Sequence, residues 1–143
     1  MGIAADAGDA EAVRAAVNGT GGRLRPSGHP GEQRRGGPSG PIEQLTVDEF
    51  DRSVAVNIRF VFVATQEALR HMGDGGRIAS IGSVLAERMP LPNGTPYSLT
   101  KAVIGGFTRA PAWEPGPRVI TVNNVSPARS TPAATQPTVT SPR

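Results

Sequence analysis

The stretch that most constrains the fold is residues 77–101, which read as a strand, a polar loop and the beginning of a helix. Gly75 and Gly76 precede a run of small and β-branched residues, a pattern typical of a buried strand. The run ends in Gly82 and Ser83. Parallel α/β sheets bind their ligands at the carboxyl ends of such strands. We therefore expect a parallel α/β fold with functional side chains close to Ser83.

Two titratable side chains, Tyr97 and Lys101, follow the loop. If Tyr97 opens a helix, their spacing places both on the same helical face, one turn apart. A nearby ammonium favours the phenolate form of a tyrosine and lowers its pKa, which suits the tyrosine to general acid or base chemistry. Ser83 could supply a hydroxyl to a substrate oxygen. For an isolated pair of this kind, a solvated helix face is the alternative interpretation.

These residues, with the small apolar run after Lys101, resemble the short-chain dehydrogenase/reductase family, and in particular its 3-oxoacyl-ACP reductase-like members. The resemblance continues through residues 118–124, which look like the family's next strand. Upstream it includes Asn57 and extends over residues 40–50, so it covers roughly 40–124 in all. It implies an NAD(P)-dependent oxidoreductase that interconverts a carbonyl and an alcohol by hydride transfer.

The resemblance also implies a role for each matching residue. Tyr97 would transfer the proton, and Lys101 would favour its deprotonated form and bind the nicotinamide ribose. Ser83 would orient the substrate oxygen, and Asn57 would hold a water in a proton relay. Asp6 matches a family aspartate that contacts the adenine of NAD or NADP, although a plain turn aspartate is the alternative there.

The fold implied by the family is a partial Rossmann-like α/β domain, a doubly wound parallel sheet. We expect it to lack the N-terminal glycine-rich βα unit that cradles the pyrophosphate. We expect this incomplete domain over residues 1–125, with an irregular part over 21–39. A disordered tail rich in Pro, Thr and Ser is expected over 126–143.

Several elements can be placed by their local signals. Residues 1–6 read as the end of a short strand, and Asp9 as the N-cap of a helix over 10–17 with two valines on one face. A long helix is expected over 48–72, capped by Thr46 or Asp48. Helical spacing predicts that its buried stripe consists of Phe50, Val54, Ile58 and Phe62.

A third helix is expected over residues 98–110, because Pro111 interrupts the pattern there. A proline in a helix interior costs about 3 kcal/mol or more. The family resemblance also suggests a homo-oligomer through this helix and the 48–72 helix, since family members commonly associate through these helices.

Two irregular stretches carry a genetic hypothesis. Residues 29–36 can be encoded by CAT CCT GGT GAA CAA CGC CGG GGN, which one base later encodes Ile-Leu-Val-Asn-Asn-Ala-Gly, a typical family strand. Residues 126–132 can likewise be encoded so that reading one base earlier gives Gln-Pro-Gly-Pro-Ile-Asp-Thr, the expected family loop. We infer frameshifts at both places, and the codons of the gene would test this.

Composition argues against several other classes of function. The chain has 143 residues, no cysteine and only two histidines, which leaves no thiolate or His-based metal site. No apolar run is long enough for a bilayer and no signal-peptide pattern opens the chain, so a cytoplasmic location is expected. The net charge of +3 comes from scattered arginines without stacking aromatics, which argues against nucleic acid.

Three functions remain in view, and a basic nucleic-acid-binding segment is the least favoured of them. The first is the oxidoreductase, acting on a small carbonyl or alcohol. The second is a non-catalytic remnant that binds no cofactor and at most associates with homologous subunits. The strands expected to be missing lie at the centre of the family's sheet, which predicts weak autonomous folding and poor cofactor affinity.

Overall fold

The computed structural model describes residues 3–20, 38–88, 92–113 and 118–127. Within them the elements are α1 (Ala10–Gly19), η1 (Ile42–Gln44), α2 (Val47–Val54), η2 (Ala55–Arg59), α3 (Phe60–His71), β1 (Arg77–Ile81), η3 (Val84–Ala86), α4 (Thr95–Trp113) and β2 (Thr121–Val125). The frameshift hypothesis for 29–36 lies outside the described residues. So do the irregular part 21–39 and the tail 126–143, apart from two residues of each.

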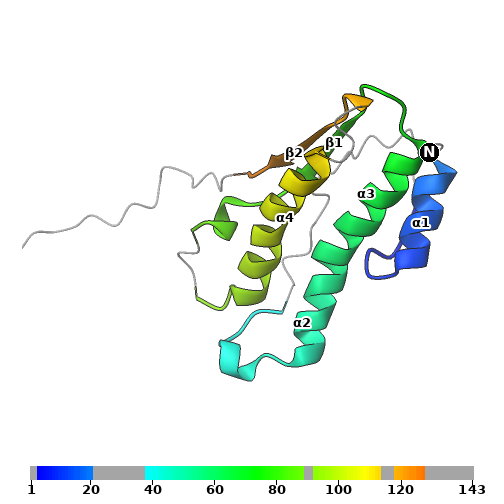
Figure 1. The fold of residues 1–143 in the computed structure, drawn as a ribbon. Helices are drawn as coiled ribbons and strands as arrows, with labels where there is room; N and C mark the ends of the chain where they lie inside the picture. The colour runs from blue at the N-terminus through cyan, green and yellow to red at the C-terminus, as the bar shows by residue number, and fades with distance from the viewer. Residues whose placement is uncertain (1–2, 21–37, 89–91, 114–117, 128–143) are drawn as a thin grey trace, which may run out of the picture.

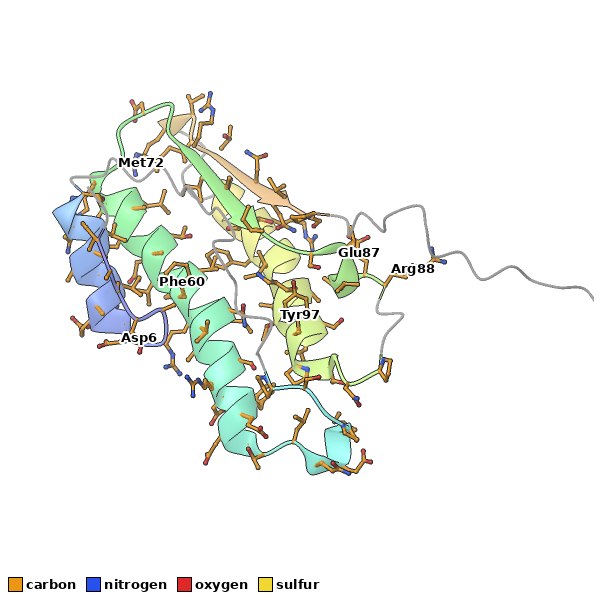
Figure 2. The ribbon with its side chains drawn as sticks, turned by 180° about the vertical axis from the view of Figure 1, so that it is seen from behind. Asp6, Phe60, Met72, Glu87, Arg88 and Tyr97 are labelled. Carbon is orange, nitrogen blue, oxygen red and sulfur yellow. The ribbon has the colours of Figure 1, made fainter. Side chains whose placement is uncertain are left out.

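The two strands form a parallel sheet, with α4 as the connection between them. The register runs from Arg77 opposite Thr121 to Ile81 opposite Val125. This strand–helix–strand unit confirms the predicted α/β class with parallel strands. Figures 1 and 2 show α4 lying against one side of the strands. Within the described residues, none of the helices combines the length and apolar character needed to cross a bilayer.

The sheet is covered on one face only within the described residues. Ser80 is buried and Val122 half-buried on the covered face, whereas Ile81 and Val125 are 41% and 50% exposed on the other. Alternate residues of a strand point to opposite faces, so this pattern follows from one layer of helices. The expectation of fully buried strands is therefore wrong for the face that no described helix covers.

Helix α1 forms as predicted and runs two residues further, to Gly19. The Asp9 carboxylate accepts hydrogen bonds from the amides of the first turn, which caps the helix. Val13 and Val17 are 2% and 3% exposed and pack with Val63 and Ala68 of α3 in the main apolar cluster. The short strand expected over residues 1–6 is not present in its described part, because residues 3–6 have no strand partner.

The predicted 48–72 helix exists as a nearly continuous rod, Val47–His71, made of α2, η2 and α3. The Thr46 hydroxyl accepts from the Glu49 amide, and the Glu49 carboxylate accepts from the Thr46 amide. This capping box explains why the rod begins there. The middle part, η2, is π-helical, which the sequence pattern did not predict.

The predicted buried stripe of this rod is wrong. Phe50 and Phe62 are 40% and 51% exposed, and Val54 and Ile58 are only half-buried. The buried positions are Ser53, Val63, Thr65, Glu67 and Ala68. A π-helical turn takes up extra residues, so it rotates the later face relative to the earlier one, and a constant spacing of four fails across it.

Helix α4 is longer than the predicted 98–110 at both ends. It begins at Thr95, where Pro96 occupies the first turn, a favourable place for proline. It continues past Pro111 to Trp113, so the expected end near residue 110 is wrong. Pro111 falls in the final turn, where few residues follow the lost hydrogen bond and the helix can still close.

Candidate functional site

Tyr97 and Lys101 lie together on α4, as their spacing predicted. The Lys101 Nζ atom is 5.9 Å from the centroid of the Tyr97 ring. Lys101 is 7% exposed and Tyr97 is half-buried. This distance is at the outer limit at which an ammonium and an aromatic ring attract each other.

The Lys101 ammonium joins α4 to the end of β1. Its Nζ atom donates a hydrogen bond to the Ile81 carbonyl at 2.9 Å. Burial lowers the pKa of Lys101, because the charged form loses hydration. An ammonium carries three donors, and the Ile81 carbonyl uses one of them. Lys101 can therefore offer further donors to a bound hydroxyl beside the carboxyl end of the strand.

Ser83 lies two residues after the end of β1 and is 7% exposed. Its Oγ atom accepts a hydrogen bond from the Leu85 amide at 3.2 Å, which caps the short helix η3. The Ser98 hydroxyl of α4 donates to the Leu85 carbonyl at 2.9 Å. These bonds hold the loop after β1 against the first turns of α4. The hydroxyl hydrogen of Ser83 can still be donated.

Asn57 lies in the π-helical segment η2, which packs against α4. Its Nδ2 atom donates to the Ser53 carbonyl at 3.1 Å. A polar residue in the middle of a helix is thus paired with local backbone, and its side-chain oxygen can accept from another group. Single π-helical turns occur frequently at functional sites. The water-holding role of Asn57 stays a prediction.

Asp6 lies apart from the other four residues. Its Oδ1 atom accepts from the Gly8 amide at 2.8 Å in the exposed turn before α1. In Figure 2 the rod of α2 and α3 runs between Asp6 and Tyr97. The structure therefore brings the elements of Asn57, Ser83, Tyr97 and Lys101 together around α4 and places Asp6 beyond the rod.

Two residues that support this site were missed by sequence reasoning. Ser98 fastens the loop, as described above, and Gly82 allows a close approach of strand β2. A Cβ atom on Gly82 would lie 2.5 Å from Oδ1 of Asn124. The glycine directly before Ser83 was a usable signal, since glycine in a strand often marks a close contact. Ser98 had no such signal.

The arrangement is suited to proton transfer. A tyrosine hydroxyl, a buried ammonium and a serine hydroxyl are carried by neighbouring elements at the carboxyl end of a parallel strand. Among the described residues, no three metal-ligating side chains gather into a cluster.

Comparison with protein families and curated proteins gives concordant results. The sequence model of the short chain dehydrogenase family matches residues 2–141. The hydroxynaphthalene reductase-like protein Arp2 of Metarhizium brunneum is 41% identical over 87 residues. That match covers 61% of this chain and 33% of the relative, so the chain spans about a third of the relative's length.

Solved structures also resemble this chain. A dehydrogenase/reductase from Sinorhizobium meliloti is 42% identical with a TM-score of 0.75, and the match covers 90% of this chain and 51% of that one. A short chain dehydrogenase from Burkholderia cenocepacia, solved in complex with NADP, is 38% identical with a TM-score of 0.71. There the match covers 85% of this chain and 50% of the other.

Proposed function

Because the chain belongs to the short-chain dehydrogenase family, we propose that it acts as an NAD(P)-dependent oxidoreductase that interconverts a carbonyl and an alcohol, with Tyr97 as the acid/base. The observation that carries this proposal is the position of Lys101. Its buried ammonium donates a hydrogen bond to the carbonyl of Ile81, the last residue of β1, and lies 5.9 Å from the centroid of the Tyr97 ring.

Each side chain has a role that fits its surroundings. The Tyr97 hydroxyl gives a proton to the substrate oxygen during reduction and takes it back during oxidation. The Lys101 ammonium stabilises the phenolate left behind. The Ser83 hydroxyl, whose hydrogen is not needed by the Leu85 amide, donates to the substrate oxygen. Asn57 accepts from a water that carries protons to and from Lys101.

The chemistry of these residues fits a nicotinamide dinucleotide. When bound, the cofactor supplies or accepts the hydride. Lys101 has donors left for ribose hydroxyls, and Tyr97 is its neighbour. The Asp6 carboxylate has an oxygen left to accept from an adenine amino group. The Burkholderia relative was solved with NADP, which supports a nicotinamide cofactor of this class.

Titration of the purified chain with NADH and NADPH, followed by nicotinamide fluorescence, tests the proposal. We expect saturable binding below about 1 mM. Tyr97→Phe keeps the ring and should keep the binding, while turnover of carbonyl substrates should fall about 10²- to 10⁴-fold. Absence of binding at millimolar cofactor would overturn the proposal.

The alternative is a non-catalytic remnant that associates with homologous subunits. It is favoured by apolar side chains left exposed on the long helices: Phe50 at 40%, Phe62 at 51%, Leu99 at 43% and Val103 at 40%. An exposed apolar face of this kind is a feature of association surfaces. Such a chain would self-associate but bind neither dinucleotide.

A further inference from the structure

Two charged side chains are buried in the part of the chain that the structure describes, Lys101 and Glu67. Lys101 belongs to the candidate site. Glu67 lies on α3 and is 5% exposed, yet nothing in the proposed reaction uses it. A buried carboxylate is unfavourable unless charged or polar partners surround it. The partners of Glu67 therefore indicate what it does.

The partners come from two helices. From α1, the Arg14 Nη1 atom lies 3.4 Å from Glu67 Oε2. From α3, Arg70 Nη1 lies 2.7 Å from the same oxygen, and His71 Nε2 lies 3.6 Å from Oε1. His71 also pairs with Asn18 of α1, with Nε2 and Oδ1 2.6 Å apart. We call these five residues the Glu67 cluster.

The charges of the cluster keep Glu67 ionised. Burial by itself raises the pKa of Glu67, but Arg70, the Asn18 amide and Arg14 together outweigh it, so the pKa is lowered from its ordinary value of 4.5. The only other carboxylate that faces the cluster from these helices in the described residues is Glu11, 3.5 Å from Arg14 and 86% exposed. At neutral pH one buried negative charge thus holds two guanidinium groups.

The cluster fixes the position in which α1 packs on α3. The apolar contacts of Val13 and Val17 attract the two helices but have no preferred direction. Hydrogen bonds from guanidinium groups to a carboxylate are directional and specify one arrangement. The position of α1 along α3 is therefore set by the Glu67 cluster, together with the hydrogen bond that Arg14 Nη1 donates to Gln66 Oε1 at 3.1 Å.

The packing position of α1 also sets the position of Asp6. The turn that carries Asp6 leads directly into the cap of α1. It lies against the rod at Val56, because a Cβ atom on Gly8 would be 3.9 Å from Cγ2 of Val56. Movement of α1 would carry this turn with it.

We propose that Glu67 is a positioning residue for the adenine end of the dinucleotide: its carboxylate holds α1 on α3 and so holds Asp6 in place. This role rests on the proposed function. Neutralising Glu67 removes the buried charge that Arg14 pairs with and leaves Arg14 only its hydrogen bond to Gln66 on α3. Helix α1 can then shift, which weakens binding of the adenine half. The nicotinamide end, built on α4, is unaffected.

The first test compares two ligands. We expect Glu67→Gln to raise the Kd for NADPH at least about tenfold. The Kd for reduced nicotinamide mononucleotide, which lacks the adenine half, should stay unchanged. Glu11→Gln removes the same charge from the exposed partner of Arg14 and should change neither value. Equal weakening of both ligands by Glu67→Gln, or of neither, would overturn the positioning role.

The second test needs no cofactor, so it separates failure of the positioning role from failure of the proposed function. A carboxyl with a lowered pKa stabilises the folded state above its unfolded value and loses this effect as the pH falls through its folded value. In the wild-type chain, hydrogen-exchange protection of the Val13 and Val17 amides should fall at acid pH before that of Ile104 on α4. In Glu67→Gln the protection of the Val13 and Val17 amides should already be reduced at neutral pH. Simultaneous loss in α1 and α4 in both proteins would contradict the role of Glu67 in seating α1.

Discussion

At the scale of single residues, burial separates side chains of the same kind. Ile104 on α4 is 1% exposed, and Ile42 in η1 is 67% exposed. Ile104 follows Lys101 by less than one turn, so its packing helps to hold α4 against its neighbours. Ile42 has no comparable contact to lose, although both are ordinary isoleucines in the sequence.

We expect Ile104→Ala to lower the free energy of unfolding by about 2–5 kcal/mol, because it removes buried methylene groups and leaves a cavity. Ile42→Ala deletes the same atoms at an exposed position and should change the free energy of unfolding by no more than about 0.5 kcal/mol. Urea denaturation followed by circular dichroism measures both. Equal effects of the two substitutions would show that α4 is not packed in solution as it is here.

At the scale of elements, the long rod depends on its N-cap residue, Thr46. Thr46 satisfies the Glu49 amide, and Glu49 in turn satisfies the Thr46 amide. At Ala55 the rod changes to the π-helical segment η2, which carries Asn57 to the side of α4. The cap therefore stabilises the element that delivers one candidate site residue.

Thr46→Ala should destabilise the chain by about 1 kcal/mol, since it leaves a first-turn amide of α2 without its partner. Thr46→Ser keeps the hydroxyl oxygen, so its free energy of unfolding should stay close to that of the wild-type chain. Hydrogen exchange of the α2 amides, compared with those of α1, locates the effect. Protection lost equally from both helices would argue against a local cap.

At the scale of the whole molecule, two kinds of apolar surface are exposed. One lies on the helices and includes Leu99 at 43%. The other lies on the sheet face that no described helix covers and includes Val125 at 50%. Either surface could be covered by a second copy, and the proposed homo-oligomer through the long helices uses the first.

We expect the wild-type chain to behave as an oligomer in size-exclusion chromatography with light scattering. Leu99→Glu should produce monomers, because a carboxylate in an apolar interface loses its hydration. Val125→Glu places the same charge on the sheet face and should leave the oligomer intact. If Val125→Glu gave monomers and Leu99→Glu did not, the interface would lie on the sheet face. If the wild-type chain were monomeric, the homo-oligomer itself would be contradicted.

The elements were predictable where their signals are local. The cap at Asp9, the beginning of the long rod near Thr46 and the order of strand, helix and strand around Tyr97 and Lys101 follow from residues a few positions apart. Capping, turn chemistry and helical spacing act over such short distances. The same spacing placed Tyr97 and Lys101 on one helix face.

The tertiary structure decided what depends on contacts between distant residues. The buried stripe of the rod was not predictable, because a π-helical turn changes its phase and neighbouring helices choose its buried face. The bond from Lys101 to the Ile81 carbonyl spans 20 residues, and that from Arg14 to Glu67 spans 53. Local spacing carries no information at such separations. The sequence by itself therefore determined the family, the strand–helix–strand order and the candidate residues, while folding decided which faces are buried and what each charge contacts.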